Sequence, residues 1–267
     1  MGKTRLDSEI FRRGLAASRE KAKALVIAGE VKVNGVKIDK PGTGVDESAE
    51  IHVNAAPPYV SRGGYKLEQA IKDFKIDFTG KVVMDVGAST GGYTDCALQN
   101  GAVKVYAIDV GYGQLDWKLR SDPRVINLER TNIRYFTLEN QEEKVDIITI
   151  DVSFISTAKV FPVVAGFIKD EGVIISLIKP QFEAGKDKVG KKGVVRSSDV
   201  HREVILASIE NAKSSGLQCV GVTYSPITGP QGNIEYFLCL QKNGEPLELL
   251  AEQVEKVVFN AHKDLGG

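Results

Sequence analysis

Lys179 is the residue whose position in this sequence most directly indicates chemistry. It follows the apolar run GVIISLI at 172–178, which is typical of a strand buried on both faces. Desolvation at the end of such a strand favours a neutral amine, which would make Lys179 a general base for a hydroxyl group. Nearby carboxylates would favour the ammonium form instead, and Lys179 would then orient the hydroxyl and stabilise an alkoxide.

Three other apolar runs lead to a carboxylate. The runs KVVMDVG, VKVYAIDV and KVDIITIDVSF carry Asp85, Asp109 and Asp151 at or near their ends. Helical patterns between the runs predict a parallel sheet covered on both faces, with helices near 91–99, 156–168 and 199–215. Late strands at 218–229 and 233–242 and a helix at 246–262 complete the predicted fold. Because ligands bind beyond the carboxyl ends of such strands, we expect the charged residues at one site.

A glycine-rich turn, DVGASTGG at 85–92, joins the first run to a helix. The glycines allow a ligand to approach the backbone, and Asp109 lies 22 residues after Gly87, where an acid would meet ribose hydroxyls. The spacing is not G-x-G-x-x-G, and no lysine follows as in a P-loop. With its acid, the pattern resembles the S-adenosylmethionine (AdoMet) site of Rossmann-like methyltransferases more than a dinucleotide site. The candidate cofactor-binding residues are Asp85, Gly87, Ala88, Ser89, Gly91, Gly92, Asp109 and Asn132.

The first 45 residues form a basic module, with ten Lys or Arg and five Asp or Glu, although the net charge of the chain is zero. Their pattern predicts a helix over 8–14, a second helix from an N-cap at Ser18 to a stop at Gly29, and a hairpin turn at Asn34-Gly35.

The hairpin register places like charges opposite each other. It pairs Lys32 with Lys37 and Val33 with Val36, and it should turn the valines inward and the lysines outward. Paired like charges destabilise a hairpin, and a polyanion laid across the lysines would remove that penalty. A solvated basic face is the alternative interpretation.

Composition narrows the class of protein. The 267 residues are 42% hydrophobic and 26% charged, as in an ordinary globular protein with one large or two unequal domains. Three cysteines without a CxxC pair argue against a disulfide framework and a zinc site, so no metal is expected. The charged N-terminus lacks a signal-peptide core, and no run reaches the roughly 18 apolar residues of a membrane span. We therefore expect a cytoplasmic protein.

Two resemblances cover nearly the whole chain. RLDSEIFRRGLAASREKAKALVIAGEVKVNG resembles the S4 RNA-binding module. SRGGYKL, DVGASTGGYTD, DVSFIS, KPQFEAG and GNIEYF resemble the TlyA-type family, whose members are named haemolysins and rRNA 2′-O-methyltransferases, although PPYV stands where some members have an Arg-containing linker. The resemblance implies an S4 domain at 1–56, a linker at 57–64 and, at 65–267, a Rossmann-like α/β methyltransferase domain of the FtsJ type.

The resemblance also implies a function. The protein would be an AdoMet-dependent rRNA (cytidine-2′-O)-methyltransferase that acts on ribosomal RNA or ribosomal subunits. Its catalytic residues would be Lys66, Asp151, Lys179 and Glu235, which match the FtsJ-like pattern. The expected RNA-binding residues are Arg5, Arg12, Arg13, Arg19, Lys23, Lys32 and Lys37 of the basic module and Lys188, Lys191 and Lys192 of the loop KDKVGKKGVVR, which could arch over the site.

Simpler structural roles exist for each catalytic candidate. Lys66 could be a surface lysine at a helix start, Asp151 a helix cap, Glu235 a salt-bridge partner, and Lys179 a residue that merely ends a strand. Two lysines and two acids at the open end of one sheet favour a joint role.

Other functions remain as alternatives. The (D/N)-P-P-(F/Y) motif of base-nitrogen methyltransferases is replaced by DVSF, and no cysteine motif of the C5 type is present. A haemolysin would need a membrane-active segment, and a pseudouridine synthase would need a synthase body after the RLD triplet. A non-catalytic ribosome factor would bind RNA without using a cofactor.

Overall fold

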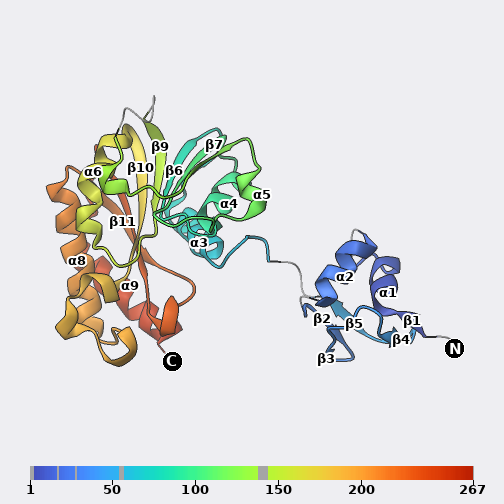
Figure 1. Cartoon of the computed structure of the whole chain (residues 1–267). Helices are drawn as coiled ribbons and strands as arrows, with labels where there is room; N and C mark the ends of the chain where they lie inside the picture. The colour runs from blue at the N-terminus through green and yellow to red at the C-terminus, as the bar shows by residue number, and fades with distance from the viewer. Residues whose placement is uncertain (1–2, 17, 28, 54–56, 138–143, 267) are drawn as a thin grey trace. The chain divides into compact units, whose positions relative to one another are not determined.

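The chain forms two compact units in the computed structural model, one up to Pro58 and one from Tyr59 (Figure 1). The structure describes residues 3–16, 18–27, 29–53, 57–137 and 144–266. Part of the segment 57–64, which the sequence predicts to be a linker, is packed into the second unit. Tyr59 is buried in the core of the second unit, and helix α3 already begins at Gly63. The aromatic ring of Tyr59 packs among apolar side chains there. The prolines and glycines on which the linker prediction rests give no sign of this packing.

Short helices and strands build the N-terminal unit. Helices α1 (Leu6–Arg12) and α2 (Arg19–Ile27) accompany a sheet of order β3-β2-β5 and a two-stranded pair β1-β4. The strands are β1 (Thr4–Arg5), β2 (Val31–Val33), β3 (Val36–Lys37), β4 (Gly44–Val45) and β5 (Ile51–Val53). Leu6, Ile10, Ala22, Val26 and Val31 are fully buried and form most of the core of this unit.

Most local features of this unit agree with the sequence. The hydroxyl of Ser18 accepts the N–H of Lys21 at 3.1 Å, as an N-cap should. Asn34 and Gly35 have φ angles of 50° and 79°, as a type I′ turn requires, and Lys32 faces Lys37 across the hairpin.

Two expectations for this unit were wrong. Val36 is 64% exposed, because β3 has only two residues and lies at the edge of its sheet. The first helix spans Leu6–Arg12 and not 8–14.

A seven-stranded sheet forms the centre of the second unit, in the order β11-β12-β10-β9-β6-β7-β8. The strands are β6 (Val82–Val86), β7 (Lys104–Ile108), β8 (Val125–Leu128), β9 (Val145–Ile150), β10 (Ile168–Ile178), β11 (Gln218–Tyr224) and β12 (Tyr236–Gln241). β8 was not predicted, because its four half-buried residues give no continuous apolar run. The sheet is also not wholly parallel, since β12 runs antiparallel to β10 and β11.

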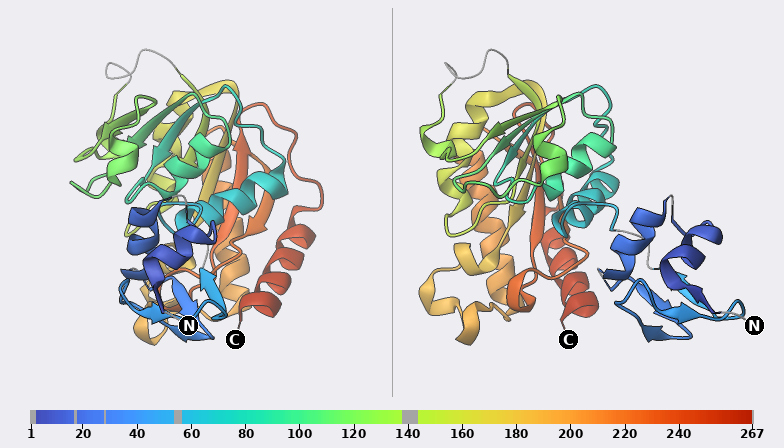
Figure 2. Two further views of the ribbon diagram at one scale, coloured as in Figure 1. Left: turned by 90° about the vertical axis from the view of Figure 1, so that its right-hand side faces the viewer. Right: turned by 45° about the vertical axis from the view of Figure 1, so that its right-hand side comes forward.

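Helices cover both faces of the sheet. Helices α6 (Phe161–Phe167), α8 (Ser198–Ser214) and α9 (Leu250–Leu265) contribute to one core cluster, and α3 (Gly63–Phe74), α4 (Gly92–Gln99) and α5 (Trp117–Arg120) contribute to the other. Figures 1 and 2 show these helices as two layers with the sheet between them. In the described part of the chain, we find no helix that could cross a membrane.

Buried acids orient the arginines of the N-terminal unit. The buried carboxylate of Asp7 accepts two hydrogen bonds from Arg5, at 2.8 and 3.1 Å, and Glu9 accepts hydrogen bonds from Arg12 and Arg13. The bonds from Arg5 lower the pKa of Asp7 to about 2, and the bonds from Arg12 and Arg13 lower the pKa of Glu9 to about 2. These guanidinium groups are therefore held in defined orientations.

We expect acid to destabilise the N-terminal unit in a defined window. Because both folded pKa values lie below those of the unfolded chain, the stabilisation is complete above about pH 4 and is lost as the pH falls through about 2. Amide NMR signals of α1, followed during an acid titration, should show this transition. Asp7→Asn should be less stable at pH 7 and should flatten the transition, whereas the exposed control Glu20→Gln should change neither. An unchanged transition in Asp7→Asn would show that the Asp7 carboxylate does not cause the acid sensitivity.

Candidate active site

The glycine turn brings two strand ends unusually close. Gly87 has a φ of +90°, and a Cβ there would lie 2.5 Å from the backbone oxygen of Asp151. The N–H of Asp151 donates to the carbonyl of Val86 at 2.9 Å. Only glycine fits this approach of the β6 turn to the end of β9. At the start of α4, a Cβ on Gly92 would lie 2.9 Å from the backbone nitrogen of Gly64, so α3 and α4 also meet closely.

A cavity of about 490 Å³ opens beside this turn. The carboxylate of Asp109 closes one wall and accepts the N–H groups of Ser89, at 2.8 Å, and Gly111, at 2.7 Å. The residues predicted for a cofactor that line this cavity are Gly87, Ser89, Asp109 and Asn132. Its walls also include residues that the sequence did not single out, namely Val110, Gln114, Ile133, Arg134 and Phe154. These lie in segments without regular periodicity, just after the strand ends.

A second cavity of about 260 Å³ adjoins the first at Gly87, Ser89 and Asp151. Ala88 and Gly92 line it, together with Lys66 and the segments 61–63 and 228–230. Gly91 lines neither cavity, and a Cβ there would overlap the side chain of Leu119. Another cavity, of about 830 Å³, lies around Asp73, Asp146 and Lys169, away from all the predicted site residues.

Asp85 is placed differently from the expected cofactor contact. It is buried and accepts hydrogen bonds from the hydroxyls of Thr94, at 2.7 Å, and Thr149, at 2.9 Å. Burial raises the pKa of Asp85 to about 6, although the two hydroxyls oppose the shift. Asp85 lines neither cavity beside the turn. As the fourth of the five residues of β6, it ties that strand to α4 and β9 beneath the glycine turn.

The four catalytic candidates form two ion pairs. Lys179 Nζ lies 2.5 Å from Asp151 Oδ1 and donates to the hydroxyl of Ser153 at 2.9 Å. Lys66 Nζ lies 2.5 Å from Glu235 Oε2. Both lysines are only 8% exposed and Glu235 is fully buried. Burial raises the pKa of the Glu235 carboxyl, Lys66 and Lys179 oppose the shift, and Asp151 adds to it, so the four groups act on one another.

The sheet order explains how these four residues meet. Asp151 follows β9 and Lys179 follows β10, which are parallel neighbours. Glu235 directly precedes β12, and because β12 runs antiparallel to β10, its start lies at the same edge as the end of β10. Lys66 reaches this edge from the first turn of α3. The reversed strand is therefore what brings Glu235 into the site.

Tyr93 belongs to the site although the sequence did not indicate it. It is buried, lines the smaller cavity, and its hydroxyl has no hydrogen-bond partner among the described residues. Burial, followed by the charges of Asp151 and Glu235, raises the pKa of Tyr93 well above its usual value. Its hydroxyl therefore stays protonated. The only signal in the sequence was its place next to the glycine turn.

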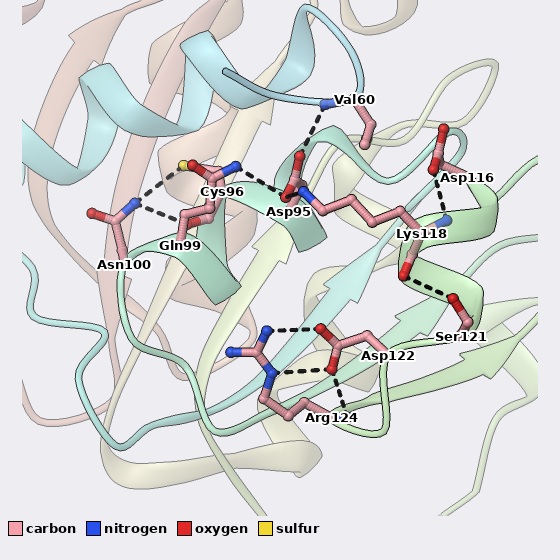
Figure 3. Close-up of polar contacts among 10 residues, drawn as sticks. All are labelled: Val60, Asp95, Cys96, Gln99, Asn100, Asp116, Lys118, Ser121, Asp122 and Arg124. Carbon is pink, nitrogen blue, oxygen red and sulfur yellow. Dashed lines mark hydrogen bonds and ion pairs between the residues drawn. The ribbon is translucent and has the colours of Figure 1, made fainter. Parts of the chain in front are cut away.

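Asp95 fixes the chain that leads to Lys66 (Figure 3). Its buried carboxylate accepts the backbone N–H of Val60 at 2.9 Å and pairs with Lys118 of α5 at 3.2 Å. The neighbouring Cys96 is buried in α4, and burial raises the pKa of its thiol to about 12. A thiol held protonated in this way is not a nucleophile, in agreement with the absence of a C5-type motif.

We call Lys66, Asp151, Lys179 and Glu235 the catalytic tetrad. The basic residues that the sequence predicts to bind RNA lie outside it, in the loop after α7 and in the N-terminal unit. The loop after α7 (Pro180–Glu183) is fixed to the segment before Glu235, because Asn233 donates to the carbonyl of Gly193 at 3.0 Å and accepts the N–H of Val195 at 3.1 Å. Lys191 and Lys192 of this loop are exposed, whereas Lys188 pairs with Glu203 of α8. That ion pair neutralises one of the three lysines predicted to bind RNA in this loop. Within the N-terminal unit, Arg19 lies 3.6 Å from Asp7, and the predicted RNA-binding lysines Lys23, Lys32 and Lys37 are all exposed.

Comparisons with known proteins agree with this architecture. Residues 59–242 match the FtsJ-like methyltransferase family, and residues 4–51 match the S4 domain. The YqxC protein of Bacillus subtilis, provisionally named an rRNA methyltransferase, is 48% identical over 98% of this chain and 95% of its own. The 16S/23S rRNA (cytidine-2′-O)-methyltransferase TlyA of Mycobacterium tuberculosis is 44% identical over 97% of both chains.

A solved structure from Streptococcus thermophilus, provisionally named a hemolysin, is also similar. It is 41% identical and superposes with a TM-score of 0.77 over 100% of this chain and 98% of its own. The chain therefore belongs to the FtsJ-like methyltransferase family, in the TlyA-type group in which an S4 domain precedes the methyltransferase domain.

Proposed function

We propose that this protein transfers a methyl group from AdoMet to a ribose 2′-hydroxyl of ribosomal RNA. The observation that carries the proposal is the pair of buried lysine–carboxylate contacts, Lys179–Asp151 and Lys66–Glu235, at the sheet edge beside a cavity suited to a nucleoside. The S4 domain supports RNA as the substrate class. The name of the M. tuberculosis relative supports cytidine as the modified nucleotide.

The residues around the larger cavity fit AdoMet. Each carboxylate oxygen of Asp109 accepts one backbone N–H and keeps a further lone pair, which suits it to the ribose hydroxyls. Ile108, Val110 and Ile133 offer an apolar surface for adenine. The glycine turn at 87–92 leaves room for the methionine end. Bound there, AdoMet supplies an electrophilic methyl group.

Lys179 performs the central task in this proposal. Asp151 lies close enough to stabilise the ammonium form of Lys179, which favours orientation of the 2′-hydroxyl over proton abstraction by a neutral amine. The ammonium donates a hydrogen bond to the 2′-oxygen and stabilises the negative charge that develops there. The carboxylate of Asp151 is placed to accept the hydroxyl proton. Lys66, held by Glu235, adds a second positive charge to the site.

Two alternatives are disfavoured by particular observations. A membrane-active haemolysin needs an apolar segment, and no described helix is long and apolar enough to cross a membrane. A non-catalytic RNA-binding factor has no use for two buried lysines and a buried glutamate beside a nucleoside-sized cavity, because even paired buried charges stabilise a fold no better than apolar packing would. Labelled methyl transfer from AdoMet to ribosomal subunits, with mapping of alkali-resistant linkages, tests the proposal directly.

Lys179→Met should remove nearly all methylation while preserving binding. Loss of the hydrogen bond to the developing oxyanion should lower kcat about 100- to 1000-fold, whereas calorimetry should show AdoMet and RNA affinities within about threefold of wild type. Lys169→Met, at the other end of β10, is the matched control and should keep full activity. Because two ammonium groups supply the positive charge, wild-type activity should survive EDTA. Near-normal turnover in Lys179→Met would remove this lysine from the mechanism.

Gly87→Ala should weaken AdoMet binding. The added Cβ would overlap the backbone of Asp151 and force the glycine turn away from β9. Gly80→Ala is the matched control, because Gly80 also has a positive φ, of +73°, but has nothing within 4 Å of a Cβ. We expect calorimetry to show at least a tenfold weaker AdoMet affinity for Gly87→Ala and an unchanged affinity for Gly80→Ala. Binding of NADH in place of AdoMet by the wild-type protein would overturn the cofactor assignment.

Removal of residues 1–56 should weaken RNA binding and reduce its dependence on salt, because fewer phosphates are neutralised. The same truncation should leave AdoMet affinity unchanged, since the residues that line the two cavities all lie in the second unit. Filter binding of ribosomal RNA across a series of salt concentrations measures the RNA affinity and its salt dependence. Equal RNA affinity at every salt concentration would refute the role of the basic module.

A further inference from the structure

Two exposed tyrosines and two arginines form a distinct surface beside the larger cavity. We call Tyr112, Arg130, Arg134 and Tyr135 the Arg–Tyr rim. Tyr112 is 68% exposed and Tyr135 is 75% exposed, although a tyrosine ring normally buries much of its area. None of the four residues belongs to the catalytic tetrad or to the glycine turn.

Backbone contacts hold the two parts of the rim together. The N–H of Arg130 donates to the carbonyl of Gly111 at 2.9 Å, and the N–H of Thr131 donates to the carbonyl of Asp109 at 2.9 Å. Asn132 caps the short turn that carries Arg134 and Tyr135 by accepting the N–H of Arg134 at 3.1 Å. Arg134 lines the larger cavity, so the rim borders the proposed cofactor site.

The arginines of the rim stack on aromatic rings and do not form ion pairs with described carboxylates. Arg130 Cζ lies 4.0 Å from the ring centroid of Tyr112, and Arg134 Cζ lies 5.2 Å from that of Tyr135. Within the described residues, neither guanidinium has an ion-pair partner. Two arginines close in sequence differ in this respect, since Arg120 pairs with Glu129 at 2.6 Å and Arg124 pairs with Asp122 at 2.7 Å (Figure 3).

The exposed rings and the guanidinium groups without ion pairs together indicate which class of molecule can bind the rim. An apolar protein surface would cover the rings but would also desolvate two positive charges without neutralising them. Unpaired RNA satisfies both needs, because its bases stack on aromatic and guanidinium planes and its phosphates neutralise the charges. We propose that the Arg–Tyr rim binds unpaired nucleotides next to the methylated one; this inference rests on the proposed function.

Binding of a fluorescein-labelled, unstructured 12-nucleotide RNA to the full-length protein tests the rim. Fluorescence anisotropy should show about a 5- to 100-fold weaker affinity for Tyr112→Ala/Tyr135→Ala, and a near-normal affinity for Tyr112→Phe/Tyr135→Phe, which keeps both rings. Phe259→Ala removes a ring that is 67% exposed on α9 and should change nothing.

Salt dependence separates stacking from charge. The alanine pair should keep the wild-type slope of log affinity against log salt, whereas Arg130→Gln/Arg134→Gln should flatten it by about one to two units. In a 5-iodouridine version of the same RNA, light-induced cross-links should map to the peptides that contain Tyr112 and Tyr135. Unchanged affinity in the alanine pair, with cross-links only elsewhere, would overturn the inference.

The methylation assay distinguishes this inference from the proposed function. If the wild-type protein methylates ribosomal RNA but the alanine pair binds RNA normally, the rim proposal fails alone. If the rim binds RNA but no methyl group is transferred, the proposed function fails and the binding surface remains.

Discussion

Burial of an ammonium group is destabilising by several kcal/mol unless a carboxylate lies beside it, and this constraint shapes the second unit. Lys66 and Lys179 are almost completely buried, and each has its own acid at 2.5 Å. The two acids come from different parts of the chain, Asp151 after β9 and Glu235 before β12. These strands and helix α3, which carries Lys66, must therefore all meet at one edge of the sheet. The antiparallel direction of β12 and the close contact of α3 with α4 meet this electrostatic requirement.

Much of this arrangement could be predicted from local sequence. Continuous apolar runs followed by a charge located β7, β9 and β10, because a strand buried on both faces needs apolar residues throughout. The Asn34-Gly35 turn fixed the hairpin register, since only a type I′ turn suits that pair. The pairing of each lysine with its own acid could not be predicted, because it depends on the order and direction of strands far apart in the sequence.

The errors have related physical causes. A charge near a strand end can face the edge or the interior of the fold, and Asp85 does the latter, bonding to Thr94 of α4 and Thr149 of β9. β8 packs at the edge of the sheet and needs no apolar run. The exposed rings of Tyr112 and Tyr135 left no pattern because they take part in neither core, and their meaning depends on arginines that the fold brings beside them.

The contact between Gly87 and Asp151 links two tasks that the proposed function separates. The turn that would hold the cofactor and the acid that holds Lys179 share a backbone interface too tight for one methyl group, so neither can shift far without displacing the other. A ligand that stiffens the turn therefore also fixes the geometry presented to the RNA. The proposed function therefore implies, by thermodynamic reciprocity, that RNA favouring this geometry tightens cofactor binding to the same degree.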